Sequence, residues 1–350
     1  MRAWTVVAAA GAAVVLASFA GACAALGPAR LARTGLSPVA LVATVALIAA
    51  LAALVWIATR VARRWWSRTL VLVAALPVVA ILALPVGVAT WAAHPALAPS
   101  SAVRPDGASD LTVEAGDGVE LAAWWLPSRD GAALVLLHGS GSTRAAVVEH
   151  AEVLRDAGYG VLMLDASGHG ASGGSPHELG WWGERDVRAA VDAVEALPGV
   201  DPDRIGVVGI SMGGEEALGA AGDDARIQAV VAEGATGRTA EDKAAWLPGG
   251  PAGAIQRAMD LERDVLLELL SPAARPGPLA GAAARSTAPT LLIVAGDVPD
   301  EATAASSLAD VDPDVDVWTV PGAAHAGALR TDPHAWRDQV VGFLSAALAP

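Results

Sequence analysis

The sequence predicts an α/β domain built on a mostly parallel sheet and preceded by three transmembrane helices. Three observations lead to this fold class. Long uncharged apolar stretches occupy the first hundred residues, apolar strand-like runs alternate with helical patterns after residue 110, and one strand-to-helix junction carries Gly-x-Ser-x-Gly. Strands that alternate with helices form parallel βαβ units with right-handed crossovers.

Charge divides the chain into two parts. Of the 23 Lys and Arg residues, seven arginines lie in the first 100 residues, which contain no Asp or Glu. The remaining 250 residues therefore carry 16 basic and 37 acidic residues, a formal charge of −21. We expect the two parts to lie in different solvents. The acidic balance also argues against nucleic-acid partners, which need clustered Lys and Arg.

The first part contains three uncharged apolar runs, at about 4–27, 37–59 and 69–93. Each exceeds the roughly 20 residues with which a helix crosses a bilayer core. Tryptophans near the ends of the runs are typical interface anchors, and Pro77 and Pro85 predict a kink in the third. Cleavage of the first run as a signal peptide is disfavoured, because two more spans follow it. We therefore expect a multi-pass cell-membrane domain at 1–96 and a linker at 97–109.

The arginines also predict the topology. The connection between the second and third spans holds four of them: Arg60, Arg63, Arg64 and Arg68. The preceding loop holds only Arg30 and Arg33. The positive-inside rule therefore places the four-arginine loop in the cytoplasm, which puts the part from residue 110 on the extracytoplasmic side. The spans contain no Asp, Glu, Lys or His, and this favours anchoring over transport.

The elements of the second part follow in order. Residues 111–114 and 119–126 flank a Gly-Asp-Gly turn and predict a β-hairpin. Strands are expected at 133–137, 159–164, 205–209, 229–233, 290–294 and 315–320, and helices at 144–157, 184–197, 212–221, 302–308 and 334–348. The alternation breaks at 236–287, which predicts an inserted cap with a helix at 254–270. The apolar side chains of this helix are either its packed face or the lining of an acyl pocket.

The junction at 205–221 predicts a nucleophile. Because Gly209-Ile-Ser211-Met-Gly213 follows a strand and opens a helix, a tight turn exposes the Ser211 hydroxyl. A serine hydroxyl needs a base, and the base needs a third group that orients it. In a parallel sheet, these partners should follow the carboxyl ends of other strands. Of the seven histidines, His325 follows the last strand in a glycine-bracketed turn and is the predicted base.

The remaining parts of the site come from three loops. Asp300, after the strand at 290–294, is the predicted acid, and Glu301 is its alternative. An oxyanion hole requires backbone N–H groups that point at the developing charge. The Met212 N–H and the Ser140 N–H are the predicted donors, with Gly141 as an alternative to Ser140.

Two other ligand classes are excluded. The Gly-Ser-Gly turn at 139–141 lacks the third glycine of a dinucleotide fingerprint, where Arg144 stands, and no Gly-Lys-Ser or Gly-Lys-Thr follows. The acidic stretch at 310–316 lacks the glycine and glutamate of a calcium loop. We therefore predict neither a cofactor nor a metal.

Four motifs occur in a fixed order: His138-Gly139, Asp165-Ala-Ser-Gly-His169-Gly-Ala-Ser172, Gly209-Ile-Ser211-Met-Gly213-Gly214 and Gly322-Ala-Ala-His325. With these motifs, residues 110–350 resemble the α/β-hydrolase superfamily, whereas the membrane part up to about residue 93 lies outside the resemblance. The resemblance implies an eight-stranded sheet and acyl transfer to water through a Ser-His-acid triad, as in esterases, lipases, thioesterases and acyl-peptidases. It also implies structural roles for Asp165 and His169. The chain departs from the family pattern at the acid, because Pro299 stands at the third place after Gly296 and Asp300 one place further.

These features predict a membrane-anchored serine hydrolase that cleaves a small-molecule carboxylic ester or thioester. Ser211 would form the acyl-enzyme, His325 would act as base and then as acid, and Asp300 would orient His325. An acyl-peptidase or amidase would use the same triad. A non-catalytic, membrane-tethered binding module is the alternative from another class, since a fold does not guarantee its chemistry.

Overall fold

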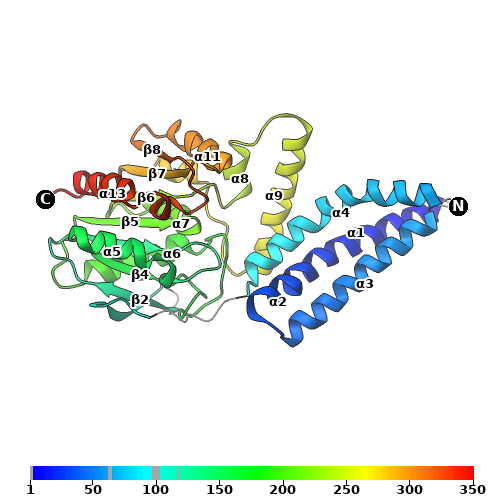
Figure 1. Cartoon of the computed structure of the whole chain (residues 1–350), viewed down its shortest axis with the longest axis horizontal. Coiled ribbons are helices and arrows are strands. Elements are labelled where there is room, and N and C mark those ends of the chain that lie inside the picture. The colour runs from blue at the N-terminus through cyan, green and yellow to red at the C-terminus, as the bar shows by residue number, and fades with distance from the viewer. Residues whose placement is uncertain (1–2, 62–64, 97–102, 117) are drawn as a thin grey trace. The chain divides into compact units, whose positions relative to one another are not determined.

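The computed structural model describes residues 3–61, 65–96, 103–116 and 118–350. The chain forms two compact units, Met1–Leu97 with Leu247–Pro272, and Ala98–Trp246 with Ala273–Pro350 (Figure 1). Of the linker expected at 97–109, residues 97–102 lie outside the described residues. The same holds for Arg63 and Arg64 of the four-arginine loop.

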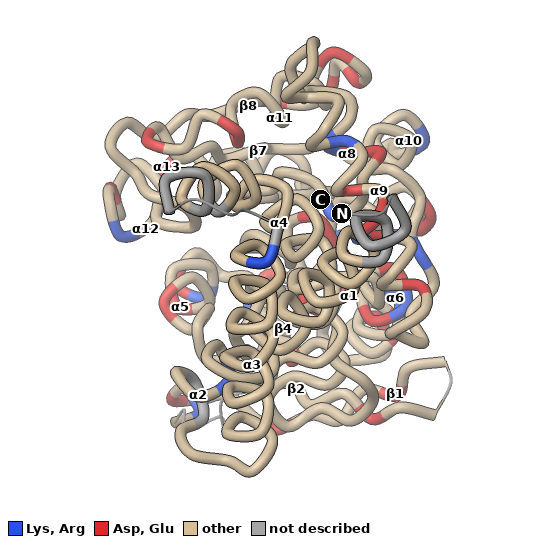
Figure 2. The backbone as a smooth tube through the Cα atoms, turned by 90° about the vertical axis from the view of Figure 1, so that its right-hand side faces the viewer, with Lys and Arg blue, Asp and Glu red and all other residues tan. Residues whose placement is uncertain are grey.

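The first unit is helical. It contains α1 (Ala3–Leu26), α2 (Pro28–Thr34), α3 (Pro38–Val61), α4 (Trp65–Ala93) and, from much later in the sequence, α9 (Gly250–Leu270). Three segments are long and apolar enough to cross a membrane: Ala9–Ala32, Pro38–Arg60 and Thr69–Ala93. They overlap the three runs expected at about 4–27, 37–59 and 69–93, and α4 continues through Pro77 and Pro85 as one helix. No red acidic residue marks α1, α3 or α4 in Figure 2.

Small residues allow close packing inside this unit. A Cβ atom added at Gly21 of α1 would lie 2.1 Å from the carbonyl oxygen of Ala83 in α4, and one added at Gly87 would lie 3.2 Å from the Gly21 carbonyl oxygen. Close approach of helix backbones at small residues is typical of helix pairs in membranes. Helix α9 contacts α4.

The second unit is built on an eight-stranded sheet with the strand order β1-β2-β4-β3-β5-β6-β7-β8. The strands are β1 (Ser109–Glu114), β2 (Glu120–Leu126), β3 (Ala133–Leu137), β4 (Gly160–Leu164), β5 (Ile205–Ile210), β6 (Ile227–Glu233), β7 (Thr290–Ala295) and β8 (Val315–Val320). The strands β1 and β2 form the predicted antiparallel hairpin, and β3 to β8 are parallel. The predicted mostly parallel sheet of eight strands is thus confirmed.

Helices cover both faces of the sheet. Because side chains alternate along a strand, Val135 and Leu137 of β3 belong to one apolar core and Leu134 and Leu136 to the other. The first core includes residues of α6 (Gly183–Glu195), α7 (Met212–Ala221), α10 (Leu279–Ala283) and α11 (Pro299–Ala309). The second includes residues of α5 (Val148–Ala157), α12 (Ala328–Thr331) and α13 (Pro333–Ala347). Double coverage explains why β3 to β5 are continuous aliphatic or glycine runs without polar alternation.

The segment predicted as a cap divides between the two units. Its short helices α8 (Ala240–Ala244) and α10 group with the sheet, whereas its long helix α9 groups with α1 to α4. A second difference concerns α11, which begins at Pro299 rather than near residue 302. Because proline suits the first turn of a helix, Asp300 and Glu301 both lie in that first turn.

Candidate active site

Ser211 lies in a strained turn between β5 and α7. Its backbone angles are φ 54° and ψ −117°, a conformation that non-glycine residues rarely adopt. A Cβ atom at Gly209 would lie 2.1 Å from the Gly213 carbonyl oxygen, so only glycine allows the turn to close this tightly. The Ser211 N–H donates to the carbonyl oxygen of Glu233 on neighbouring β6 at 2.6 Å, which ties the turn to the sheet.

His325 comes from the loop after β8. Its Nε2 accepts a hydrogen bond from the Ser211 hydroxyl at 2.8 Å, although 114 residues separate the two in the chain. Its Nδ1 donates to Glu301 Oε1 at 2.6 Å. The imidazole is about half exposed, with 49% of the side chain accessible, so it bridges a buried carboxylate and an open serine. The structure therefore brings together the predicted nucleophile and the predicted base.

The carboxylate that contacts His325 belongs to Glu301, and the choice of Asp300 is corrected. Glu301 is 1% exposed, and its second oxygen accepts a hydrogen bond from the Ala295 N–H at 2.8 Å. Asp300 is exposed to solvent. The start of α11 at Pro299 is the physical reason, because consecutive residues of a helix point about 100° apart, and the phase set by this start turns Glu301 inward.

Acidic groups around His325 favour its protonated form. The hydrogen bond to Glu301 raises the pKa of His325, against the opposing effect of burial, and the charges of Glu301, Glu215 and Glu233 act in the same direction. An imidazolium formed during catalysis is stabilised by such a site.

Sequence reasoning missed two of these carboxylates. Glu215 on α7 accepts hydrogen bonds from the N–H groups of Thr236 (3.0 Å) and Gly237 (2.7 Å). Glu233 at the end of β6 accepts from the Ala328 N–H at 2.9 Å and from Trp336 Nε1 at 3.0 Å, which fixes the segment just after His325. Both side chains are buried. The signal that could have identified Glu233 is a charged residue that ends the mostly apolar strand 227–233.

The loop after β3 lies against the nucleophile. A Cβ atom at Gly139 would lie 3.4 Å from Ser211 Cβ, and Ser140 lines the same cavity as Ser211. Neither the Ser140 N–H nor the Met212 N–H donates to another residue in the described part of the chain. Their use as oxyanion donors stays a prediction, which this placement suits.

A buried glutamate holds this loop. Glu178 Oε2 accepts from the Ser140 hydroxyl at 2.5 Å and from the Gly141 N–H. Its other oxygen lies 3.6 Å from His169 Nε2. Burial lowers the pKa of His169, but the nearby Glu178 carboxylate outweighs this effect and raises it. Glu178 was not identified from the sequence, because its place in an irregular loop gives no periodic signal.

His138 has a fixed tautomer at the base of the loop. Its Nδ1–H donates to the Gly139 carbonyl oxygen at 2.8 Å, and its Nε2 accepts from the Ala166 N–H at 3.1 Å. Burial is the main cause that lowers the pKa of His138 to about 4, so the ring is neutral at pH 7. This histidine therefore has a structural place under the loop.

Asp165 has a similar structural place. It accepts two hydrogen bonds from Arg144, from its N–H at 2.7 Å and its Nη1 at 2.9 Å, and one from the Ala171 N–H at 2.9 Å. The carboxylate is fully buried. These contacts fix the ends of two loops beside the site.

A cavity of about 660 Å³ opens at Ser211 and His325. Its apolar lining includes Ile210 and Leu329, and its polar lining includes Glu149, His150 and Arg330. A volume of this order suits a small-molecule substrate. Burial lowers the pKa of His150 to about 4, with the charge of Arg330 acting in the same direction.

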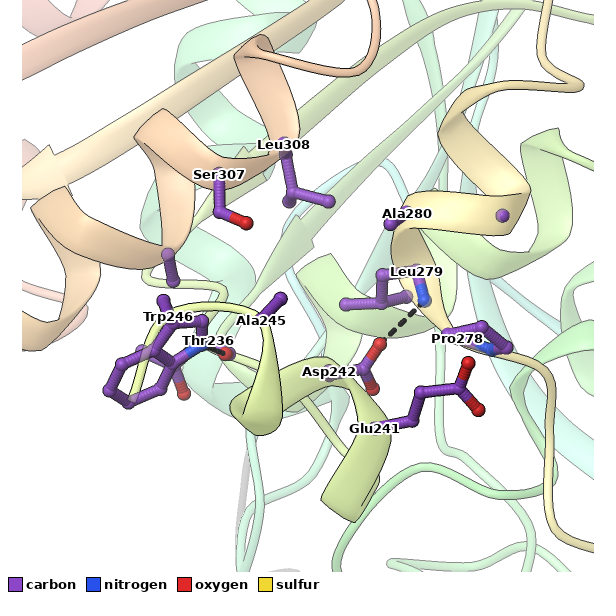
Figure 3. Close-up of a pocket in the computed structure, with 12 residues that line it drawn as sticks. Thr236, Glu241, Asp242, Ala245, Trp246, Pro278, Leu279, Ala280, Ser307 and Leu308 are labelled. Carbon is purple, nitrogen blue, oxygen red and sulfur yellow. Dashed lines mark hydrogen bonds between the residues drawn. The ribbon is translucent and has the colours of Figure 1, made fainter. Parts of the chain in front are cut away.

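A second cavity, of about 350 Å³, lies among α8, α10 and α11 (Figure 3). Asp242 in its wall accepts from the Leu279 N–H at 2.6 Å and from the Thr239 N–H at 2.9 Å. Neither Ser211 nor His325 lines it, and its carboxylate already has backbone partners, so it is no candidate for the reaction. Among the described residues, no group of three His, Cys, Asp or Glu side chains is arranged to hold a metal ion.

Comparisons with known proteins assign the fold of this unit. Residues 128–269 match the family described as serine aminopeptidase, S33. An esterase of Pyrococcus furiosus superposes with a TM-score of 0.54 over 69% of this chain and 93% of the esterase, at 24% identity, which shows a shared fold. The second unit has the α/β-hydrolase fold. The family match includes Ser140 and Ser211 but ends before Glu301 and His325, which the structure brings to the same site.

Two curated relatives are similar to part of this chain. An uncharacterised protein of Mycobacterium tuberculosis is 36% identical over 162 residues, which are 42% of this chain and 57% of the relative. A thiohydrolase of Aspergillus aculeatus is 35% identical over 120 residues, 33% of this chain and 37% of the thiohydrolase. The chain thus spans little more than half the length of the mycobacterial relative and less of the fungal one.

Proposed function

We propose that this chain is a membrane-anchored serine hydrolase that cleaves a carboxylic ester or thioester by way of an acyl-enzyme on Ser211. The observation that carries the proposal is the continuous hydrogen-bonded relay from the Ser211 hydroxyl through His325 to the buried Glu301. The same relation of nucleophile, base and orienting acid recurs on unrelated folds that activate serine for acyl transfer.

In the acylation step, Ser211 Oγ attacks the carbonyl carbon of the substrate while its proton passes to His325 Nε2. Glu301 accepts the Nδ1–H bond, so Nε2 is free to take the proton, and the carboxylate stabilises the imidazolium that forms. The carbonyl oxygen becomes an oxyanion next to the Ser140 and Met212 N–H groups. When the carbon–oxygen or carbon–sulfur bond breaks, the leaving group takes the proton from Nε2.

In the deacylation step, water enters and gives a proton to His325 Nε2 as it attacks the acyl carbon. The second tetrahedral intermediate collapses, the carboxylic acid product leaves, and Ser211 Oγ recovers its proton from His325. The half-exposed imidazole suits this step, because water reaches it without displacement of protein groups.

The choice among ester, thioester and amide rests on analogy. The esterase of similar fold favours an ester substrate, and the fungal thiohydrolase favours a thioester. The family name, serine aminopeptidase, favours an amide bond next to the amino terminus of a peptide. The exposed Glu149 carboxylate in the cavity wall is the observation that favours the peptidase alternative, because a carboxylate attracts an amino terminus.

The deciding experiment uses a fluorophosphonate probe with the wild-type protein, Ser211→Ala and the control Ser306→Ala, whose exposed serine lies on α11. We expect labelling of the wild type and the control but not of Ser211→Ala. Steady-state rates on p-nitrophenyl esters, an acyl thioester and aminoacyl p-nitroanilides then rank the three bond types. If the folded wild-type protein is not labelled by the probe and hydrolyses none of these substrates, the enzyme proposal fails, and a membrane-tethered binding module becomes the favoured function of this domain.

The anchoring and topology are proposed from the three apolar helices and the arginine distribution. In a Cys23→Ala background, Asp316→Cys places a lone thiol on the exposed edge of β8. We expect a membrane-impermeant maleimide to label this thiol in intact cells as well as in lysed ones. Labelling only after lysis would contradict the extracytoplasmic placement while leaving the anchor in place.

A further inference from the structure

Helix α9 has its polarity reversed relative to a surface helix of a water-soluble protein. Leu261, Val265 and Leu269 are 53%, 46% and 77% exposed, and the exposed Ala254 and Ala258 continue the same stripe toward the start of the helix. Spacings of three and four residues place these side chains on one face. A helix in contact with water would turn such a stripe toward a core.

The opposite face of α9 is charged and buried. Asp260, Arg263 and Asp264 follow the same three- and four-residue spacing and are at most 4% exposed. Arg263 Nη1 lies 3.2 Å from Asp260 Oδ1, and Arg263 Nε donates to Asp264 Oδ1 at 2.9 Å. Gln256 Nε2 donates to the other Asp260 oxygen at 3.1 Å. These contacts pair the buried Arg263 guanidinium with both carboxylates, so each buried charge has a partner of opposite sign on the same helix.

The neighbours of α9 indicate what its apolar stripe faces. The helix belongs to the same compact unit as the three candidate membrane spans and contacts α4. Those spans also expose large apolar side chains, among them Leu84 and Val88 on α4 and Val45 on α3. The stripe on α9 is therefore apolar and exposed, like the surfaces of the candidate membrane spans, which are suited to lipid.

Helix α9 does not itself meet the requirements of a membrane span. Its 21 residues include two arginines and four acidic residues, and it is absent from the candidate spans. An apolar face combined with a charged one is typical of helices that lie in the plane of the membrane interface. Because its net charge is negative, its lipid contact must depend on apolar area rather than on attraction to anionic headgroups.

We propose that α9 lies in the bilayer interface, with the stripe formed by Ala254, Ala258, Leu261, Val265 and Leu269 against the lipid acyl chains. The inference rests on the proposed membrane anchor and goes beyond it. A segment that follows α4 by more than 150 residues, inserted between two strands of the hydrolase sheet, then forms a fourth contact of the chain with lipid.

The test measures the depth of single labels in the full-length protein. In the Cys23→Ala background, Leu261→Cys, Val265→Cys and Leu269→Cys each receive an environment-sensitive nitrobenzoxadiazole label after reconstitution into phosphatidylcholine vesicles. Gln256→Cys, exposed on the same helix but on the side opposite the stripe, is the matched control. A melting temperature within a few degrees of that of the Cys23→Ala parent verifies that each variant is folded.

Two further labels calibrate the experiment. Val45→Cys, on an exposed position of α3, reports a membrane span, and Asp316→Cys reports the aqueous hydrolase sheet. We expect the stripe labels to be quenched by acyl-chain nitroxide lipids. Their iodide quenching constants should be about fivefold or more below that of Asp316→Cys, because an aqueous anion does not enter the acyl region. Gln256→Cys should lie nearer to the aqueous value.

The outcomes separate this inference from the anchor. Stripe labels as accessible to iodide as Asp316→Cys, together with a lipid-quenched Val45→Cys label, would overturn the inference and leave the anchor standing. If Val45→Cys is also accessible to iodide, the anchor fails and the inference with it. Inclusion of phosphatidylglycerol should change the stripe quenching by less than about twofold, and a strong requirement for it would overturn an apolar contact.

Discussion

The assignment of Glu301 as the orienting acid is tested by comparing Glu301→Gln with Asp300→Asn. The first substitution preserves side-chain size and removes the charge. Its amide oxygen is expected to retain the Ala295 N–H bond of Glu301 Oε2, which leaves the amide NH2 facing His325 Nδ1. An amide NH2 only donates, so Nδ1 must become the acceptor and the ring proton must move to Nε2.

A His325 ring protonated at Nε2 cannot take the proton of Ser211, because the nitrogen 2.8 Å from Oγ has lost its lone pair. Loss of the correct tautomer in such a triad lowers kcat by about 10³- to 10⁴-fold, and at 1.36 kcal/mol per factor of ten this is about 4 to 5.5 kcal/mol of transition-state stabilisation. Asp300→Asn changes an exposed carboxylate with no contact to His325, so kcat should stay within about twofold.

The assay is the steady-state rate on p-nitrophenyl butyrate, measured across pH 5 to 9 for both variants. Protonated His325 cannot act as a base, so activity rises with pH through its pKa. Glu301 raises this pKa, and its loss in Glu301→Gln should therefore shift the acid limb of any residual activity to lower pH. A larger loss in Asp300→Asn than in Glu301→Gln, or an unshifted acid limb, would refute the assignment.

Three further predictions follow from groups around the site. Burial holds the pKa of His138 and of His150 near 4, against 6.5 for an unperturbed histidine. A fall in pH from 6.5 to 4 therefore favours unfolding, by about 3 kcal/mol for each ring. Urea unfolding at stepped pH measures this effect, and His150→Leu should remove the contribution of about 3 kcal/mol that this ring makes. An unchanged dependence of stability on pH in that variant would contradict the account. Glu178→Gln should loosen the loop that Glu178 holds and lower kcat by about 10- to 100-fold, while the melting temperature stays within a few degrees of the wild-type value. A wild-type kcat in this variant would show that the loop needs no carboxylate. A Cβ at Gly213 would lie 2.7 Å from the backbone of β3, so Gly213→Ala should lower kcat by more than about 100-fold or abolish folding. Gly342 has open space around it, so Gly342→Ala should leave kcat and folding unchanged or improve stability. Equal effects of the two substitutions would refute the steric argument.

Much of the hydrolase sheet could be predicted because its signal is local. The runs 133–137 and 205–209 are continuous aliphatic or glycine residues bounded by turns, as buried parallel strands require, and the glycines around Ser211 mark the one tight turn that the site needs. The order of nucleophile, acid loop and histidine along the chain then placed Ser211 and His325 together, since parallel strands end at one edge of a sheet.

The acid could not be predicted, because the choice depends on the phase of a helix. Asp300 and Glu301 are neighbours of similar chemistry, and spacing from the strand favours the first. The start of α11 at Pro299 and its packing against β7 and β8 set which of the two points inward. A sequence pattern with an uncertainty of one or two residues at helix ends cannot resolve a rotation of about 100°.

Helix α9 illustrates a different gap between pattern and placement. Its periodicity identifies an amphipathic helix, and the sequence interpretation assigned the leucines to a packed face or to an acyl pocket. Periodicity states that one face is apolar but not which medium it meets. In the structure, Leu267 is buried and Leu269 is 77% exposed, within the unit that also holds the three candidate membrane spans. A helix encoded between two strands of the sheet thus belongs to the same compact unit as the apolar helices of the first hundred residues. If the lipid contact of α9 is confirmed, the division between the membrane part and the aqueous part of the chain depends on which helix faces contact lipid. The position in the sequence at which acidic residues first appear does not define it.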